Sequence, residues 1–359
     1  MTQASDVTSG GKAHFEVLDG LRGSAALLIV LFHIQGITVD FSPAKVLVHH
    51  GHLAVDFFFC LSGFVIAYAY DERWSRMSAG SFLQARFFRL HPLVLIGATL
   101  GLISYLFDPF AGALQQVPGW RIALTYLLML LALPAAPMPN RWTDTHPFDG
   151  PLWTLFQEYI GSLLYALVLR KLSTRTLGIL ALAAGGLTLY CGVAHNTMDG
   201  GSDWASWWMA PERLAYPFLT GLWLHRVRGR LPRLHLGFLP LTLLMAAALL
   251  TPVPWNGLYE ALCVLLLFPA IIVMGAHHDN SGRLAGLCRV SGRLSYPIYI
   301  THFTFCYVFM NFVGQTHPET GTEIIAGAAM VPFLILVAWI VSRFWDEPVR
   351  AWLKRFRSA

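Results

Sequence analysis

The stretch that decides the fold is "LDGLRGSAALLIVLFHIQG", residues 18–36. It is apolar almost throughout, yet Arg22 stands near its start and His33 follows eleven positions later. Apolar runs of about twenty residues match the hydrocarbon thickness of a bilayer. Eleven residues at 100° each return to within roughly 20° of the same helix face, with a rise of about 16 Å. The stretch therefore predicts a membrane-spanning helix with Arg22 and His33 on one stripe.

The rest of the chain repeats this apolar pattern. Of its 359 residues only 13% are charged, and the mean hydropathy is +0.54. Repeated apolar runs of this length cannot all pack inside one soluble core, so we predict an all-α polytopic membrane protein. The apolar segments lie at about 21–39, 53–70, 90–107, 120–137, 151–169, 176–194, 211–225, 234–250, 256–275, 293–312 and 324–345. The first has no small-residue cleavage site, so it is expected to be a retained helix and not a signal peptide.

The positions of the basic residues predict the topology. Clusters follow the second, fifth, seventh, ninth and last segments: Arg73, Arg76, Arg86 and Arg89; Arg170, Lys171 and Arg175; Arg226, Arg228, Arg230 and Arg233; Arg283, Arg289 and Arg293; Arg343, Arg350, Lys354, Arg355 and Arg357. All of them fall on one face only if segment 120–137 does not cross, as the positive-inside rule favours. Its "LALPAAPMP", residues 131–139, suits a re-entrant or interfacial piece. We predict about ten transmembrane helices, with both termini cytoplasmic, in the inner (cytoplasmic) cell membrane.

The expected organisation is a flexible cytoplasmic N-terminal tail (1–17), one transmembrane domain (18–346) and a basic cytoplasmic C-terminal tail (347–359). Because the basic residues flank apolar segments, the net charge of +5 reflects topology and does not indicate a nucleic-acid partner. Five cysteines without CxxC spacing predict buried thiols, with neither a disulfide framework nor a zinc site. The outer-loop histidines lack a further ligand set, so no metal is predicted there: His49, His50 and His52.

Ionisable residues inside membrane segments are costly unless they face a cavity or a partner. Arg22 and His33 fit either a snorkelling arginine plus a packed histidine, or a functional pair in which neutral His33 is a general base. Asp56 opens the second segment, where a carboxylate is also favoured by the helix dipole. Arg86 and Arg89 share a helix face and suit phosphate binding, although cytoplasmic anchoring explains them too.

Three further polar positions stand in later segments. Pro92 marks the expected start of the third helix. Glu158 lies in an apolar helix beside Trp153, so its carboxylate must be paired, protonated or in a wet cavity. In "GRLSYPIYITHF", residues 292–303, Tyr299 and His302 could bind substrate or only connect helices by hydrogen bonds.

Taken in order, these motifs resemble the acyltransferase-3 family of integral-membrane O-acyltransferases. The resemblance rests on "LDGLRGSAALLIVLFH", "VDFFFCLSGF", "RFFRLHP", "LWTLFQEYIGSLLYAL", "LSYPIYITHF" and "DEP", and it covers nearly the whole chain. The basic-x10-His spacing and the FF-LSGF block are specific together. The fifth-segment motif departs from the family pattern around Glu158, because its Phe and Tyr positions are shifted.

The resemblance implies transfer of an acyl group, usually acetyl, from cytosolic acyl-CoA to a hydroxyl of a carbohydrate or glycolipid acceptor, without a metal. Carried over by position, the CoA phosphates would be bound by Arg22, Arg86 and Arg89. The catalytic residues would be His33, Asp56 and Glu158, and the substrate-binding residues Trp153, Tyr299 and His302. His33 would deprotonate the acceptor hydroxyl or handle the acyl group, and Asp56 could orient it or bind the acceptor.

Two alternatives stay open at this point. The acceptor could be a small secreted molecule such as a macrolide sugar. The ionisable residues could instead form the path of a proton-coupled permease. The chain shows no internal repeat of the kind that transporters often carry, which disfavours the permease.

Overall fold

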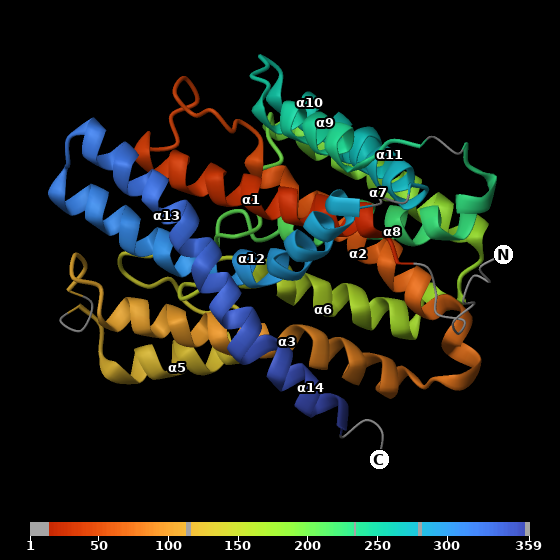
Figure 1. Ribbon diagram of the computed structural model, residues 1–359, viewed down its shortest axis with the longest axis horizontal. Coiled ribbons are helices and arrows are strands. Elements are labelled where there is room, and N and C mark those ends of the chain that lie inside the picture. Colours follow the sequence, from red (N-terminus) through yellow and green to blue (C-terminus); the bar gives the residue numbers. More distant parts are fainter. Residues whose placement is uncertain (1–13, 113–115, 233–234, 279–281, 356–359) are drawn as a thin grey trace, which may run out of the picture.

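The computed structural model describes residues 14–112, 116–232, 235–278 and 282–355. Within these ranges every regular element is a helix, and the only strand-like features are two isolated bridges, Arg141–Thr143 and Asp144–Asp203. Figure 1 shows most of the long helices lying side by side along the long axis of the molecule. The all-α prediction is confirmed.

The helices account for each predicted apolar segment. They are α1 (Glu16–Thr38), α2 (Ala54–Tyr70), α3 (Ala79–Leu106), α5 (Gly119–Leu130), α6 (Leu152–Leu167), α7 (Thr174–His195), α8 (Met209–Val227), α9 (Phe238–Leu250), α10 (Asn256–Leu262), α11 (Phe268–Ala276), α12 (Gly282–Thr316), α13 (Thr320–Val341) and α14 (Glu347–Arg355). Short turns extend them: η1 (Gly51–Leu53), η2 (Asp71–Arg76), η3 (Leu169–Lys171), η4 (Arg228–Arg230) and the π-helical η5 (Cys263–Leu267) and η6 (Ser342–Asp346).

Seven helical stretches among the described residues are long and apolar enough to cross a membrane. They are Glu16–Thr38, Gly51–Arg76, Ala79–Leu106, Leu152–Lys171, Thr174–His195, Asn256–Ala276 and Thr320–Arg355. The 12-residue α5 and 13-residue α9 are about 18 and 20 Å long, short of the roughly 30 Å hydrocarbon core. The chain is thus a polytopic membrane protein, while the number of ten spans stays a prediction.

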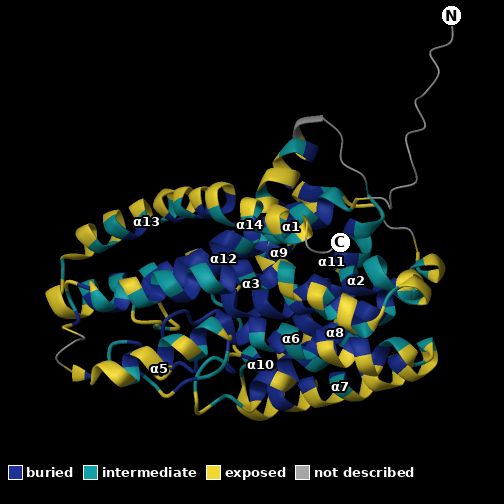
Figure 2. Cartoon of the chain, turned by 90° about the horizontal axis from the view of Figure 1, so that it is seen from below, coloured by how far each residue is buried: buried dark blue, intermediate teal, exposed yellow. Residues whose placement is uncertain are grey.

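The outer faces of the helices carry the large apolar side chains that lipid would cover. Leu182 on α7 and Ile325 on α13 are more than two-thirds exposed, and Figure 2 shows exposed residues along both helices. All five cysteines are buried and free, as predicted.

Two pairs of helices form the centre of the bundle. α1 packs against α12, and α2 packs against α8. A Cβ added at Gly63 would lie 2.2 Å from the carbonyl oxygen of Phe218, and one at Gly221 would lie 2.0 Å from that of Cys60. The backbones of α2 and α8 therefore approach closely through small residues.

The start predicted for the third helix is wrong. α3 begins at Ala79, where the Ser78 side chain accepts a hydrogen bond from the Ser81 amide and caps the helix. Pro92 lies inside the helix, and the indole of Trp345 donates to its carbonyl at 2.6 Å. Because α3 begins at Ala79 and continues through Pro92, Arg86 lies within the helix.

The structure describes part of each predicted tail. Residues 1–13 lie outside the described residues, and α1 begins at Glu16, inside the predicted tail. Residues 347–355 form α14, which packs against α3. At both ends, therefore, helical structure continues past the predicted domain boundary.

The segment 131–151 after α5 is irregular and runs into the protein interior. Arg141 in this segment is fully buried, with its guanidinium 4.9 Å from the Tyr105 ring and 4.7 Å from the Tyr307 ring. Burial raises the pKa of Asp144 to about 7 and lowers the pKa of His146 to about 4. Irregular backbone of this kind is tolerated in a membrane protein because it is enclosed by protein.

Candidate active site

A cavity of about 190 Å³ lies between α1, α2, α3, α6 and α12 and reaches η6 and α14. Five of the nine residues predicted for the site line it: Arg22, Arg86, Arg89, Glu158 and Tyr299. These residues come from α1, α3, α6 and α12, so the fold brings together positions more than 270 residues apart. We call this space the arginine cavity.

Arg22 joins α1 to α12 at one side of the arginine cavity. Its guanidinium pairs with Asp19 at 3.1 Å and donates to the carbonyl of Gly292 at 3.0 Å. A longer contact of 3.4 Å reaches the hydroxyl of Ser295. Arg22 is therefore fixed in place and partly neutralised by Asp19.

Arg86 is buried in the cavity wall and is neutralised by Glu158, with which it forms a close ion pair. The same Glu158 oxygen accepts a hydrogen bond from Ser62 at 2.8 Å, and Arg86 also donates to Ser162 at 3.3 Å. The carboxylate of Glu158 thus has a partner on each of two neighbouring helices. Its geometry is that of a counterion for Arg86.

Arg89 differs from its neighbour in forming no direct ion pair, although the carboxylates of Glu158 and Asp346 act on it electrostatically. It lines the arginine cavity and is exposed, and within the described residues it makes no ion pair or hydrogen bond. An arginine without a partner inside a cavity is a ready site for an anion.

A second, shallower hollow shares lining residues with the arginine cavity and has more basic residues, which the sequence explained only by topology. Its walls include Arg289, together with Arg22, Arg293 and Arg350, which border both spaces. Arg293 is exposed and pairs with Glu347 at 3.5 Å, and the partly buried Arg350 pairs with Asp346. We call this space the outer hollow.

Tyr299 closes the opposite end of the arginine cavity. Its hydroxyl lies 2.9 Å from that of Thr154, and its ring centroid is 5.5 Å from that of Phe58. Behind it, 6.1 Å away between ring centroids, lies the imidazole of His302. His302 Nε2 is 3.1 Å from Nδ1 of His33 on α1.

The prediction that Arg22 and His33 share one stripe of α1 is confirmed. Both side chains contact α12: Arg22 through Gly292, and His33 through His302. The arginine lies at the cavity and the histidine lies beyond Tyr299, so a single helix connects the two ends of the candidate site.

Asp56 does not pair with His33. It is fully buried and forms an ion pair with Arg213 on α8, with oxygen–nitrogen distances of 2.5 and 3.3 Å. The same guanidinium lies 5.5 Å from the ring of Trp153, which is buried outside the lining of the arginine cavity. The structure thus places Asp56 and Trp153 in a packed region next to the site.

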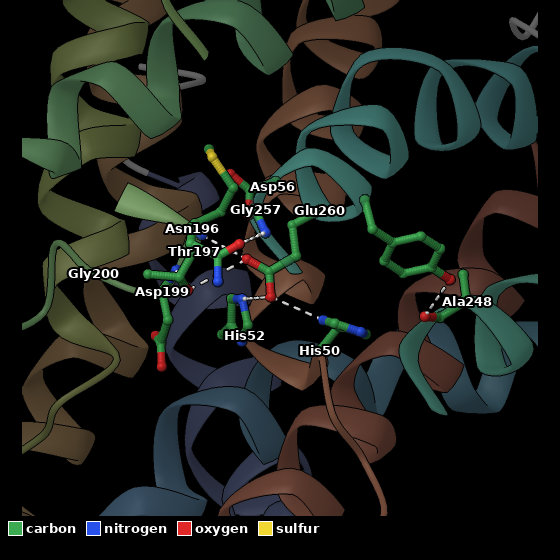
Figure 3. A network of polar contacts seen from close by, with 12 residues as sticks. His50, His52, Asp56, Asn196, Thr197, Asp199, Gly200, Ala248, Gly257 and Glu260 are labelled. Atoms are coloured by element: carbon green, nitrogen blue, oxygen red, sulfur yellow. Dashed lines mark hydrogen bonds and ion pairs between the residues drawn. The ribbon is translucent and has the colours of Figure 1, made fainter. Parts of the chain in front are cut away.

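A second buried network adjoins Arg213, which also donates to the carbonyl of His52 at 2.9 Å. Figure 3 shows Glu260 between His50 and His52. A carboxylate oxygen of Glu260 is 2.8 Å from Nδ1 of His50 and 3.2 Å from Nε2 of His52. Glu260 also accepts from the amide of Met198. We call the buried groups Asp56, Arg213, His50, His52 and Glu260 the paired cluster. Among residues that the structure describes, no group of three or more His, Cys, Asp or Glu side chains is arranged so that it could hold a metal ion.

Sequence reasoning missed Arg213 and Glu260. Each is an ionisable residue in an apolar segment, which is the signal that drew attention to Glu158. Arg293 and Arg350 were read only as topological charge, because nothing in the sequence shows that α12 and α14 converge on the same space.

Comparison with known proteins decides the family. The acyltransferase-3 family model, described as an acyltransferase domain, matches residues 15–343. The chain belongs to the acyltransferase-3 family. The cavity and the histidine pair are therefore features of a membrane acyltransferase.

Two relatives are similar to this acyltransferase. "Protein 2 in picA locus" of Rhizobium radiobacter is 34% identical over 161 residues, which cover 42% of this chain and 81% of that protein. "Acyltransferase MdmB" of Streptomyces mycarofaciens is 26% identical over 322 residues, which cover 80% of this chain and 77% of that protein. No solved structure matches the chain significantly.

Proposed function

We propose that this enzyme transfers an acyl group, acetyl foremost, from cytosolic acyl-CoA to a hydroxyl of a cell-envelope or exported carbohydrate. The donor phosphates would bind in the arginine cavity and the outer hollow. The hydroxyl would be activated at His33. Orientation in the inner membrane, with these arginines on the cytoplasmic side, is part of the same proposal and rests on the basic residues around the cavity.

Arg89 carries this proposal. An exposed cationic side chain that forms no direct ion pair among the described residues and lines the cavity beside Arg22 and Arg86 favours an anionic ligand. Acyl-CoA supplies phosphates at one end and a thioester at the other. The family supplies the reaction class, acyl transfer.

The reaction follows from the order of groups along α1 and α12. In this proposal the phosphates lie at the arginines and the pantetheine arm runs toward Tyr299. The side chains of Tyr299 and Phe58 must move for the thioester to reach His33. His33 takes the hydroxyl proton as the acceptor oxygen attacks the thioester carbonyl. The new C–O bond forms, the C–S bond breaks, and the proton passes from His33 to the departing thiolate.

The test uses membranes containing the protein and acetyl-CoA labelled in the acetyl group. Wild type is expected to move label into glycan or lipid-linked carbohydrate, and His33→Gln to lose that activity by at least about 100-fold. His317→Gln, at an exposed position away from the cavity, is the matched control and should behave as wild type. Full transfer by the His33 variant would contradict the proposal.

The same experiment separates the alternatives. Label in a small secreted product would move the acceptor to the class of small molecules such as macrolide sugars. Exchange of a solute across vesicles without CoA consumption would indicate a permease instead.

A further inference from the structure

The hydrogen-bond partners of His302 determine which of its ring nitrogens carries a proton. Its Nδ1 lies 2.8 Å from the carbonyl oxygen of Tyr299 and 3.1 Å from that of Ile298. Carbonyl oxygens only accept hydrogen bonds, so Nδ1 must carry the proton. His302 is fully buried and makes no ion pair within the described part of the chain, so a second proton would leave an uncompensated buried charge. Neutral His302 therefore has its lone pair on Nε2.

That lone pair in turn determines the tautomer of His33. Nδ1 of His33 lies 3.1 Å from Nε2 of His302. Because this nitrogen of His302 can only accept, His33 Nδ1 must donate. Neutral His33 then has its lone pair on Nε2, and the carbonyl of Ile29, one turn earlier on α1, is a further hydrogen-bond acceptor for the ring. The side chain is half-buried, so this nitrogen is not sealed off.

The ring of His33 is held from two sides. It stacks on His302 with centroids 5.2 Å apart and an interplanar angle of 28°. The Phe303 ring lies 4.7 Å away at 84°. These contacts restrict rotation, so the hydrogen bond and the packing select one orientation of the imidazole as well as one tautomer.

We infer that His302 is the positioning residue that holds His33 in the tautomer with Nε2 free to accept the acceptor hydroxyl proton. This inference rests on the proposed role of His33 as base. It also changes the role expected for His302: both its ring nitrogens are occupied within the protein, which leaves none for a substrate. When His33 becomes an imidazolium, its Nδ1–H bond to His302 becomes charge-assisted and stronger.

Two variants separate positioning from packing. The amide oxygen of His302→Gln reaches the place of Nε2 and can accept from His33, whereas His302→Asn ends near the place of Nδ1 and keeps only the bonds to the two carbonyls. Thiol release from acetyl-CoA is measured in vesicles containing each variant. We expect kcat within about tenfold of wild type for the Gln variant and at least about 100-fold lower for the Asn variant. The KM for acetyl-CoA should be unchanged in both, because the phosphates bind at the arginine end.

A measurement without turnover keeps this result separate from the proposed function. Nitrogen NMR of ¹⁵N-histidine-labelled protein in detergent, with His33 assigned by subtraction of the His33→Gln spectrum, reports the protonation of each ring nitrogen. Wild type should show protonated Nδ1 and unprotonated Nε2 at His33, and His302→Asn a redistribution. A proton on His33 Nε2 in wild type, or equal kcat for the Gln and Asn variants, would overturn the inference. If acetyl-CoA is no donor at all, the proposed function fails, while the spectra still decide the pairing.

Discussion

The arginine cavity and the paired cluster contain the same kinds of side chain but use them differently. In the paired cluster, Asp56 and Arg213 are both buried and satisfy each other, and Glu260 is enclosed by two histidines. In the arginine cavity, Arg86 forms an ion pair with Glu158, but Arg89 lines the cavity without a direct ion pair. The charges of the paired cluster compensate one another, whereas the arginine cavity retains a positive charge that is available to a ligand.

This difference teaches that intramembrane charge alone does not mark a catalytic group. Asp56 and Glu158 drew attention in the sequence because carboxylates are expensive in a membrane. In the structure each of them forms an ion pair with an arginine, Asp56 with Arg213 and Glu158 with Arg86. The groups that remain available are Arg89 and His33.

The largest expected effect comes from breaking the paired cluster. Arg213→Gln leaves Asp56 as a buried carboxylate without its partner, which should lower the free energy of unfolding by about 3–5 kcal/mol. Thermal unfolding of purified protein in detergent measures this loss. The double variant Asp56→Asn with Arg213→Gln removes both charges and should recover much of it. If the single variant unfolds at the wild-type temperature, Asp56 is not held as described.

Removing Arg89 should weaken donor binding and leave stability unchanged, whereas removing Arg213 should lower stability. Arg89→Gln is expected to raise the KM for acetyl-CoA by about 10- to 100-fold, the loss of roughly 1.5–3 kcal/mol for a hydrogen bond to a charged group, with an unchanged melting temperature. Arg343→Gln, an exposed arginine outside the cavity lining, is the control and should leave KM unaltered. An unchanged KM in the Arg89 variant would remove the case for phosphate binding.

A smaller effect on the KM for acetyl-CoA is expected in the outer hollow. The 3′-phosphate of CoA is farther from the thioester than the diphosphate, so it is expected beside Arg293 and Arg350. Because Arg293 is largely exposed, Arg293→Gln should raise KM only about two- to fivefold. The increase should vanish with 3′-dephospho-acetyl-CoA as donor. Equal effects on both donors would place the 3′-phosphate elsewhere.

A further effect concerns pH and the buried segment 131–151. The pKa of Asp144, about 7 in the folded protein, is above its ordinary value of 3.8 because of burial. Between these values the folded state retains a proton that the unfolded state releases, so this group lowers stability as pH rises from about 4 to about 7. The melting temperature should therefore fall more between pH 5 and pH 8 in wild type than in Asp144→Asn. Identical slopes would contradict this assignment.

Part of this architecture could be predicted because it depends on local periodicity. The eleven-residue spacing of Arg22 and His33 determines their common face whatever α1 packs against. The three-residue spacing of Arg86 and Arg89 likewise puts them on one helix. The apolar segments predicted the helices for the same reason, although the start of α3 predicted from Pro92 was wrong.

The rest depends on contacts between distant segments. Arg86 and Arg89 look equivalent in sequence, and only the position of Glu158 on α6 distinguishes them. His302 could be named as a candidate, but its hydrogen bond to His33 spans 269 residues. The burial of Arg141 between two tyrosines was equally hidden, because an isolated arginine in a loop normally indicates exposure.

The most direct measurement of the central claim, that acyl-CoA lies in the arginine cavity with its thioester end toward Tyr299, is disulfide trapping at Thr154. Thr154 lines the cavity beside Tyr299, and the five native cysteines are buried, so background reaction should be low. Thr154→Cys treated with CoA disulfide should gain the mass of one CoA, and acetyl-CoA or the added substitution Arg89→Gln should suppress the adduct. A Thr154→Cys protein that reacts with a small methanethiosulfonate but never with CoA disulfide would contradict the account.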